Sequence, residues 1–565
     1  MFEKILIANR GEIAVRVART CRELGVHVVA IHSDVDASAR YVALADQAVH
    51  LPGVAPAETY LNVEAVIEAA RTTGAEAIHP GYGFLSERAD AAEAVTAAGL
   101  VWVGPPAEAT RAAGDKVKAR NLAQSAGVQP VPGTLEPVRD PADVLAFGAE
   151  HGYPVAIKAA AGGGGRGLKV ASGPDGVPAA FESAIREATA YFGQGDVYLE
   201  RYLVRPKHVE VQVLAPAAGK TVWLGARDCS MQRRHQKLVE ETPPPLFAEV
   251  VPEMGKAAVA VADACGYVNA GTVEFLVDPA TSRFYFLEIN ARLQVEHTIT
   301  EEVLGLDLVA AQLRIAAGDP LGFDPGALSP RGHAIECRIN AEDPRRGFIP
   351  GPGRITRYRE PAGPGTRVDS GFGEGDEVPR AYDSLIAKLV VWGAGREEAR
   401  RRMLRALDEF VIEGIPTTIP AHRLLLENSE FVDGSYSTQT VEGGALDALT
   451  VKTVRPTGDA AGQAVLMVRG ARVKLWNPAV AGSMSAASRG GGGSGKGTVV
   501  APMHGTILKV LVAEGDAVKA GDPVALLETM KMETHVAAAT AGTVRSVSVE
   551  AGAIVEAGEV VATVG

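Results

Sequence analysis

The chain has 565 residues, of which 47% are hydrophobic and 22% charged, a composition typical of globular proteins with roughly three or four domains. Its formal net charge of −12 argues against a large nucleic-acid surface, because phosphate binding requires a basic face. A local basic pocket for a small anion remains compatible with this charge.

The cysteines and the N-terminus point to a reducing compartment. Four cysteines lie far apart and form no Cys-x-x-Cys pair, so neither a zinc site nor a disulfide framework is expected. The opening MFEKILIANRGEIAVR has charges inside its apolar run, so we do not expect a signal peptide. The sequence contains no run of about 18 uncharged apolar residues, so we expect no membrane-spanning helix. The expected location is the cytoplasm.

The first hundred residues show a β-α-β pattern. KILIAN (4–9) and VHVVAIHS (26–33) are short apolar runs, and GEIAVRVARTCRELG (11–25) between them has apolar residues at helical spacing. A further helix is expected near 62–73 and a further strand in LVWVG (100–104). The alternation predicts a parallel sheet with helical crossovers.

A second unit, residues 130–203, contains a glycine-rich loop. AGGGGRG (161–167) lies between the strand-like runs YPVAIKA and LKVA, and no helix follows directly, which argues against a dinucleotide fold. Lys158 ends the first run and Arg166 lies in the loop. Backbone N–H groups of such a loop can approach phosphates closely while a lysine neutralises them. Phosphate binding is therefore favoured over an ordinary turn.

Residues 204–447 read as antiparallel strands and helices, several of which carry charges. Glu288 and Asn290 are two apart and share a face, and Glu274 sits on another apolar strand where a carboxylate has no packing role. Oxygen ligands of this kind suit Mg²⁺ beside nucleotide phosphates. The alternative is that each is a polar residue on a solvent-facing strand.

Further charged residues surround these three in the sequence. ARLQVEH supplies Arg292, Gln294 and Glu296, where a guanidinium can hold a small oxyanion and a carboxylate can take its proton. A surface ion pair is the alternative. RRHQKLVEETP adds His235 and Lys237, and Arg338 lies in HAIECRIN between apolar neighbours. An inward-facing arginine normally has an ionic partner.

The C-terminal part contains a linker and an internal repeat. VLMVRGARVKLW predicts a hairpin that turns at residues 469–470, and a Gly/Ser/Ala tract follows it. Residues 501–526 recur as 538–563, with their glycines at one offset, which predicts two similar four-stranded halves packed face to face. Lys531, in ETMKMET between the repeats, is predicted to lie on an exposed hairpin.

Together these motifs resemble a known family. HPGYGFLSE, AGGGGRG, EINARLQVEH and HAIECRINAED are similar to those of the biotin carboxylases, which are ATP-grasp enzymes, and the resemblance covers residues 1–447. APMHG, ETMKMET and GTV resemble biotin carboxyl carrier domains. The combination resembles α subunits of biotin-dependent acyl-CoA carboxylases of the actinobacterial type.

The resemblance implies an α/β fold with an all-β carrier. The carboxylase would span 1–447, with a Rossmann-like N-terminal domain at 1–115, a glycine-rich ATP-grasp lid at 130–203 and an α+β catalytic domain at 204–447. A small connecting or docking segment would cover 448–482, a Gly/Ser linker 483–497, and a barrel-sandwich carrier 498–565.

The resemblance also implies roles for individual residues. Those expected to hold ATP are Lys116, Lys158, Gly163, Gly164, Gly165, Glu200, Leu203, His208, Gln232 and His235. Glu274, Glu288 and Asn290 would bind Mg²⁺ or Mn²⁺. Those expected to bind bicarbonate or biotin are Lys237, Arg292, Gln294, Val295 and Arg338, and Lys531 would carry biotin through an amide.

In the implied mechanism, Glu296 is the general base that lets bicarbonate attack the γ-phosphate of ATP. Carboxyphosphate then yields CO₂ and phosphate, and Arg338 stabilises the charge that develops on biotin; Lys237 and Arg292 complete the catalytic set. The implied partners are a biotin protein ligase and a separate carboxyltransferase β subunit. A homodimeric carboxylase is also implied, since Arg19 and Glu23 match interface positions of the family.

Several alternatives remain open at this stage. An α component of a pyruvate, methylcrotonyl-CoA or urea carboxylase, or of an oxaloacetate decarboxylase, would share the same residues. A lipoyl-type carrier joined to another ATP-grasp ligase would use the same hairpin, although lipoyl carriers usually show Asp-Lys-Ala in place of Met-Lys-Met. The acyl acceptor and the stoichiometry of the assembly do not follow from the sequence.

Overall fold

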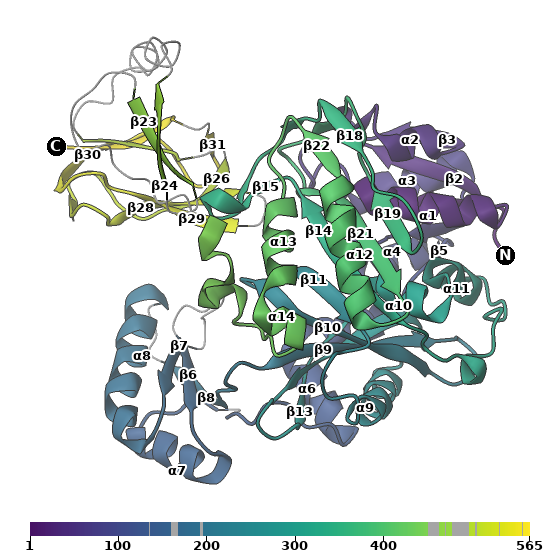
Figure 1. Cartoon of the computed structure of the whole chain (residues 1–565), viewed down its shortest axis with the longest axis horizontal. Coiled ribbons are helices and arrows are strands. Elements are labelled where there is room, and N and C mark those ends of the chain that lie inside the picture. Colours follow the sequence, from purple (N-terminus) through teal and green to yellow (C-terminus); the bar gives the residue numbers. More distant parts are fainter. Residues whose placement is uncertain are drawn as a thin grey trace. The chain divides into compact units, whose positions relative to one another are not determined.

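The computed structural model describes residues 1–134, 136–159, 168–192, 196–449, 463–468, 471–476, 497–502, 505–529, 532–555 and 558–565. The chain divides into two compact units, residues 1–450 and 451–565. Figure 1 shows the helices and strands of both units. Within the described residues, none of the helices combines the length and the apolar character that a membrane crossing requires.

The N-terminal part is a five-stranded parallel sheet with the order β3-β2-β1-β4-β5. Helix α1 buries Ile13, Val17 and Cys21 beside β1 and β2, which confirms the predicted β-α-β pattern. The strands are β1 (Lys4–Ile7), β2 (His27–His32), β3 (Gln47–His50), β4 (Ala77–His79) and β5 (Val101–Trp102). The helices are α1 (Gly11–Glu23), α2 (Arg40–Leu44), α3 (Val63–Thr73), α4 (Ala89–Ala97) and α5 (Ala107–Gly114).

A small three-stranded antiparallel sheet follows helix α6 (Lys116–Ser125). Its strands are β6 (Val155–Ala159), β7 (Leu168–Ala171) and β8 (Val197–Arg201), with β6 in the middle. Helices α7 (Pro141–His151) and α8 (Val177–Phe192) share one apolar core with this sheet. Strands β6 and β7 pair with Lys158 opposite Leu168, so the glycine run, which lies outside the described residues, joins two antiparallel strands.

The largest sheet has eight strands in the order β13-β12-β9-β10-β11-β14-β21-β19, and every neighbouring pair is antiparallel. This confirms the antiparallel strands predicted for residues 204–447. The strands are β9 (Lys207–Ala215), β10 (Val222–Arg233), β11 (Gln236–Thr242), β12 (Asn269–Val277), β13 (Phe284–Asn290), β14 (His333–Asn340), β19 (Thr366–Ser370) and β21 (Leu385–Gly393).

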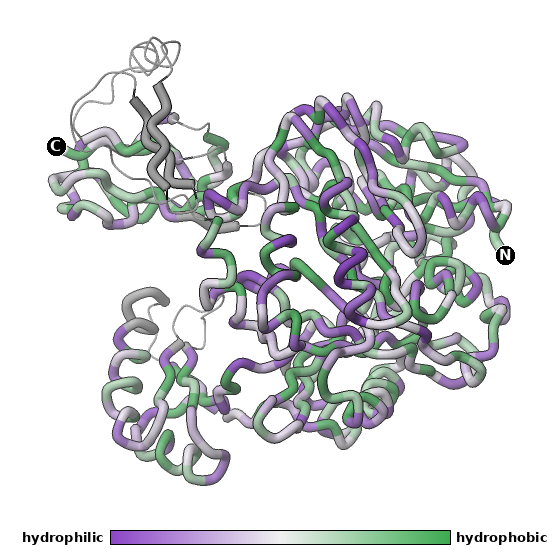
Figure 2. Tube along the Cα trace, in the orientation of Figure 1, coloured by the Kyte–Doolittle hydropathy of each residue, from purple (hydrophilic) through white to green (hydrophobic). Residues whose placement is uncertain are grey.

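The two faces of this sheet differ in composition. One face is mainly apolar: Val211 and Phe275 share a core with α9 (Val251–Ala264), and Cys337 and Leu389 share another with α12 (Arg396–Glu409) and α13 (Ile419–Glu427). Side chains alternate between faces along each strand, so the residues in between reach the opposite face, which carries a row of buried charges. In Figure 2 much of α12 is purple, in keeping with its charged sequence REEARRRMLRALDE.

Short elements complete the first unit. The helices are α10 (His297–Leu304), α11 (Leu308–Ala316) and α14 (Ser429–Asp433). Three two-stranded ladders pair β15 (Glu342–Asp343) with β16 (Ile349–Pro350), β17 (Gly353–Arg354) with β20 (Glu377–Val378), and β18 (Arg357–Arg359) with β22 (Val411–Glu413).

In the second unit, β23 (Gln463–Val468) and β24 (Ala471–Trp476) form the predicted hairpin. Two four-stranded sheets follow, with the orders β25-β32-β30-β27 and β29-β28-β26-β31 around one apolar core. Their strands are β25 (Thr498–Val500), β26 (Gly505–Val510), β27 (Ala517–Val518), β28 (Pro523–Thr529), β29 (Met532–Ala537), β30 (Gly542–Val547), β31 (Ile554–Val555) and β32 (Val560–Val564).

The two sequence repeats interlock. The repeat predicted two four-stranded halves, and the structure has two four-stranded sheets. The sheets do not coincide with the repeats, because β27 of the first repeat joins the sheet of β30 and β32, and β31 of the second joins the sheet of β26 and β28. Each repeat therefore contributes to both sheets, and neither half has a closed sheet of its own. Strands β28 and β29 pair with Thr529 opposite Met532, and Lys531 between them lies outside the described residues.

Candidate active site on the charged face of the sheet

Lys237 lies at the centre of the charged face. Its ammonium is 2.6 Å from Glu210 Oε2, 3.1 Å from Glu274 Oε1 and 2.5 Å from Glu296 Oε1. Burial opposes the charge of Lys237, but the surrounding negative groups outweigh burial and hold its pKa well above the ordinary value. Consecutive residues Leu238 and Val239 both enter the apolar core, because the β10–β11 register shifts at Met231. This irregularity lets Lys237 and Glu240 share the charged face.

Glu296 precedes α10 and is fully buried. One carboxylate oxygen contacts Lys237, and the other accepts a bond from Arg338 Nη2 at 2.9 Å. Burial alone would raise the pKa of Glu296, but Lys237, Arg338 and Arg227 hold it well below the ordinary value. Glu296 is therefore ionised and flanked by two cations at neutral pH.

Arg338 lies on β14 and has two anionic partners. Its Nε donates to Glu240 Oε1 at 2.6 Å, and its Nη2 donates to Glu296. The sequence argument that an inward-facing arginine has an ionic partner is thus confirmed, and the structure identifies both partners.

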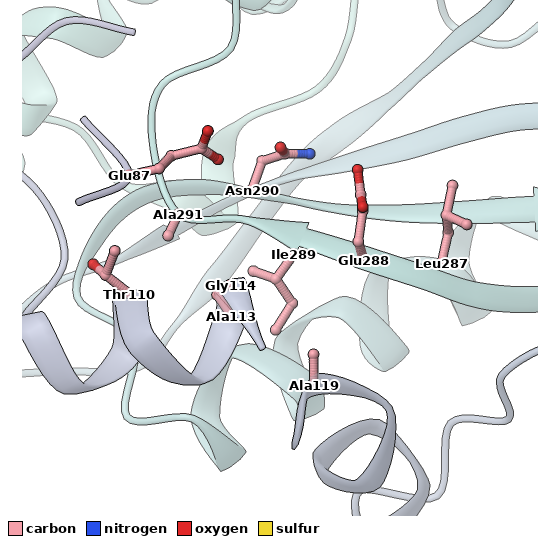
Figure 3. A pocket seen from close by; sticks show the side chains of 10 residues that line it. All are labelled: Glu87, Thr110, Ala113, Gly114, Ala119, Leu287, Glu288, Ile289, Asn290 and Ala291. Carbon is pink, nitrogen blue, oxygen red and sulfur yellow. The ribbon is translucent and has the colours of Figure 1, made fainter. Parts of the chain in front are cut away.

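The three proposed metal ligands lie on adjacent strands. Glu274 on β12 is opposite Glu288 on β13, and Asn290 donates its amide to Glu274 Oε1 at 2.8 Å. Glu274 also contacts His208 Nε2 at 2.7 Å. Glu288 and Asn290 project to one side of β13 while Ile289 projects to the other (Figure 3). Two carboxylates and an amide oxygen are the hard ligands that Mg²⁺ prefers, so this donor set fits the ion.

Glu288 and Asn290 line a cavity with a volume of about 260 Å³. Its other walls come from α5 and from the segment before α4, including Thr110, Gly114 and Glu87 (Figure 3). The cavity is therefore formed where the N-terminal part meets the eight-stranded sheet.

The loop after β13 positions Arg292 beside the same site. Arg292 Nη1 donates to Gln294 Oε1 at 2.9 Å, and its Nε is 3.2 Å from Glu87 Oε2. The amide nitrogen of Gln294 is buried without a hydrogen-bond partner among the described residues. The carbonyl of Val295 accepts from the buried Lys388 Nζ at 3.1 Å. A guanidinium and an unpaired amide donor side by side can hold a small oxyanion.

The residues expected to hold ATP are dispersed over the first unit. Lys158 on β6 is 2.5 Å from Glu200 on β8, and Leu203 packs with Val131 and Tyr285. Gln232 lies 3.3 Å from His208 Nδ1, and His235 is exposed in the turn between β10 and β11. Lys116 begins α6, with its side chain undescribed, and Gly163, Gly164 and Gly165 lie outside the described residues.

Sequence reasoning missed five buried charged residues at this site: Glu210, Arg227, Glu240, Glu336 and Lys388. Arg227 Nε donates to Glu210 Oε1 at 2.6 Å, and Lys388 is 3.0 Å from Glu12 on α1. The signal that identified Glu274 and Arg338, a charge at an alternate position of an apolar strand, is also present in HVEVQVL and HAIECRIN.

Models of four protein families match this chain. The biotin carboxylase N-terminal domain matches residues 1–110, the ATP-binding domain of the carbamoyl-phosphate synthase L chain 115–323, and the biotin carboxylase C-terminal domain 336–443. The family described as biotin-requiring enzyme matches residues 497–564. The first three lie on the first unit and the fourth on the second.

Individual proteins agree with the families. The biotin-dependent acyl-coenzyme A carboxylase alpha3 subunit of Mycobacterium leprae is 44% identical over 590 residues, covering 99% of this chain and 98% of that protein. A pyruvate carboxylase subunit of Methanothermobacter thermautotrophicus is 48% identical, covering 78% of this chain and 90% of that one.

A similar solved structure is the biotin carboxylase domain dimer of Hydrogenobacter thermophilus 2-oxoglutarate carboxylase, in complex with MgADP, ADP and bicarbonate. It has a TM-score of 0.70 and 44% identity, and the match covers 79% of this chain and 99% of that one. Since the alignment to the M. leprae relative runs through both units, the two activities that the families describe lie on one polypeptide. The chain belongs to the family of biotin-dependent acyl-CoA carboxylase α subunits, ATP-dependent ligases that join a biotin carboxylase to a biotin carrier domain.

Proposed function

We propose that this chain carboxylates biotin on its own Lys531 and, with a separate carboxyltransferase β subunit, serves an acetyl- or propionyl-CoA carboxylase. The end-to-end similarity to an acyl-CoA carboxylase α subunit supports this acceptor class. The observation that carries the carboxylase chemistry is the cluster in which Glu296 lies between Lys237 and Arg338, beside three oxygen-bearing residues suited to a metal ion.

We assign the metal ion to Glu274, Glu288 and Asn290. Bound with ATP, Mg²⁺ or Mn²⁺ would neutralise charge on the phosphates. ATP itself is assigned to Lys116, Lys158, Gly163, Gly164, Gly165, Glu200, Leu203, His208, Gln232 and His235. The pairing of Lys158 with Glu200 holds that ammonium between β6 and β8, where it can meet a phosphate.

Bicarbonate is assigned to Arg292, Gln294, Val295 and Lys237. The unpaired amide of Gln294 and the neighbouring guanidinium supply donors for its oxygens. Glu296 takes the proton as a bicarbonate oxygen attacks the γ-phosphorus and the bond to ADP breaks. While Lys237 and Arg338 contact Glu296, the pKa of Glu296 is too low for a strong base. Bicarbonate that draws Lys237 away would raise that pKa when the base is needed.

The carboxyphosphate so formed would give CO₂ and phosphate, and the phosphate would accept the biotin proton. When bound, biotin supplies a ureido nitrogen that takes up CO₂. Arg338, fixed by Glu240 and Glu296, presents its guanidinium to the ureido group and stabilises the negative charge that develops there.

The proposed partners are the carboxyltransferase, a biotin protein ligase and a second copy of this chain, and the proposed location is the cytoplasm. On α1, Arg19 is partly exposed and Glu23 is exposed, one turn apart, as the assigned dimer contacts require. The proposed domains are the carboxylase at 1–447 and the carrier at 498–565, with segment 448–482 as the docking piece.

A second candidate is an α component of a pyruvate carboxylase. The 48% identity to the pyruvate carboxylase subunit of M. thermautotrophicus favours it, although that match covers 78% of this chain. The residues of the biotin carboxylase site do not distinguish the two, because the acceptor binds to the partner subunit.

Two experiments test the proposal. Purified chain should hydrolyse ATP only with bicarbonate and should carboxylate free biotin, and mass spectrometry after ligase treatment should show biotin on Lys531. Hydrolysis without bicarbonate, or an unmodified Lys531, would contradict it. Co-purification of the β subunit from the native cell, followed by assays with acetyl-CoA, propionyl-CoA and pyruvate, separates the two acceptor classes.

A further inference from the structure

Two buried carboxyl groups face each other beside Arg338. Glu240 on β11 and Glu336 on β14 are directly opposed in the antiparallel ladder, and both are fully buried. Side chains so opposed lie on one face with Cβ atoms about 4.5–5.5 Å apart. Neither residue is among those assigned to ATP, the metal ion, bicarbonate or biotin.

In each residue of this pair, one carboxyl oxygen has a hydrogen-bond donor and the other has none among the described residues. Glu240 Oε1 accepts from Arg338 Nε, and Glu336 Oε2 accepts from the hydroxyl of Thr298 on α10. The other oxygen of each, Glu240 Oε2 and Glu336 Oε1, is buried with no hydrogen-bond partner among the described residues. A buried carboxylate oxygen without a donor costs free energy, and one proton placed between the two opposed carboxyl groups would give each of these oxygens a partner.

The surrounding charges agree with a single proton on the pair. Burial raises the pKa of Glu240 to about 7, against the opposing effect of Arg338. Burial raises the pKa of Glu336 well above its ordinary value, and the Glu240 carboxylate adds to the rise. Two adjacent carboxyls of this kind do not both ionise. The charged groups that act on the pair are Arg338 (β14), Lys388 (β21), Lys237 (β11) and Glu296 (before α10).

We propose that Glu240 and Glu336 share one proton, held on Glu336 Oε1 and donated to Glu240 Oε2, and that this pair is the positioning element for Arg338. All four carboxyl oxygens then have a partner, and Glu240 remains the anion that Arg338 requires. This inference rests on the proposed role of Arg338 toward biotin.

The arrangement fixes the direction of the Arg338 guanidinium. Glu240 holds Nε and Glu296 holds Nη2, while Nη1 has no hydrogen-bond partner among the described residues. Glu296 must loosen its contact when it takes a proton from bicarbonate, since a protonated carboxyl attracts a guanidinium less. Glu240 is then the remaining anion that keeps Arg338 in place for the biotin step.

The first test is spectroscopic and does not depend on turnover. The infrared difference between the wild-type chain and E336Q at pH 7 should contain the carbonyl stretch of one protonated carboxylic acid. The matched control E64Q, at an exposed glutamate on α3, should not change that band. No loss of a protonated-carboxyl band in E336Q would overturn the shared proton, whatever the enzyme carboxylates.

The second test separates positioning from folding. E336Q supplies an amide that donates to Glu240 and accepts from Thr298, so its rate of free-biotin carboxylation should fall much less than that of E240Q. E240Q removes the anion, and its rate of free-biotin carboxylation should fall about 10- to 100-fold, the scale of a misplaced reacting group. Its bicarbonate-dependent ATP hydrolysis without biotin should fall much less.

Equal loss of both activities in E240Q, or an unchanged rate with biotin, would overturn the positioning role. Failure of the proposed function has a different signature, because the wild-type chain itself would then not carboxylate free biotin while the infrared band would still be present.

Discussion

The two faces of the eight-stranded sheet use buried carboxylates in opposite ways, and adjacent residues on β11 illustrate the difference. Glu241 lies on the mainly apolar face and accepts bonds from His333 (2.6 Å), Arg396 (2.7 and 2.9 Å) and Tyr436 (2.6 Å). Burial would raise its pKa, but these donors bring it to about 2. Glu240, on the other face, accepts only from Arg338 among the described residues and keeps one oxygen without a partner, and its pKa is raised to about 7.

This contrast shows how a buried carboxylate that stabilises the fold can be distinguished from one that serves the active site. A carboxylate whose oxygens all have donors stabilises the fold and does not need a ligand. Among the described residues, Glu240 and Glu336 on the face that holds Lys237 each keep an oxygen without a hydrogen-bond partner, and the amide nitrogen of Gln294 in the loop after β13 also lacks one. Substitutions on either face test this division, from the largest expected effect to the smallest.

The largest effect is expected for Glu296→Gln on the charged face. The amide cannot accept a proton from bicarbonate, so bicarbonate-dependent ATP hydrolysis should fall about 10²- to 10⁴-fold, the usual contribution of a general base. Lys237 keeps Glu210 and Glu274, and Arg338 keeps Glu240, so the unfolding midpoint in urea should change little. Activity within a few fold of wild type would remove Glu296 from the mechanism.

Glu241→Gln should have the opposite effects, a large loss of stability with little change in activity. Breaking its buried ion pair with Arg396 and its contact with His333 should lower the free energy of unfolding by about 3–5 kcal/mol, while KM for ATP and bicarbonate should stay unchanged.

The pH dependence of Glu241→Gln gives a second measurement. Because the folded-state pKa of Glu241 is about 2, below its ordinary 4.5, the carboxylate contributes stability above that ordinary value and loses it as pH falls toward the folded-state pKa. Urea unfolding below about pH 5 should show a shallower acid dependence in the variant than in the wild type. An equal slope in both proteins would show that Glu241 is not the group responsible.

Much of this architecture could be predicted from the sequence, and the limit has a physical cause. Helical and alternating periodicity located the N-terminal β-α-β unit and the strands of the large sheet, and a charge within an apolar strand identified Glu274 and Arg338. The pairing Glu240–Glu336 could not be predicted, because it joins strands 96 positions apart and depends on the register between them. Lys388 in LIAKLVVWG was not identified from the sequence, although it is fully buried and contacts Glu12 on α1.

The carrier unit shows the same limit. The repeat predicted the number of strands, but local spacing cannot decide which sheet a two-residue strand joins. Strands β27 and β31 each pair with a strand of the other repeat, and that exchange produces the interlocked sheets.

On the apolar face, Leu389→Ala should cost about 2–5 kcal/mol of unfolding free energy, since the side chain is fully buried in the core under α12 and its removal leaves a cavity. The matched variant Leu389→Met conserves volume and should cost less than about 1.5 kcal/mol. Both should keep wild-type KM values below their unfolding temperature. A changed KM for bicarbonate in Leu389→Ala would show that the two faces are coupled through β21, which carries Lys388 on its other side.

The smallest effect is expected for an ion pair that lies on neither face. Arg357 and Glu413 connect β18 to β22 at 3.4 Å, and each side chain is more than half exposed. Water screens this pair and both long side chains lose rotamer freedom, so a double-mutant cycle with Arg357→Ala and Glu413→Ala should give a coupling of about 0.2–1 kcal/mol. The same cycle at Arg396 and Glu241 should give several times more, because Glu241 is fully buried. Equal couplings would mean that burial does not set the strength of these pairs.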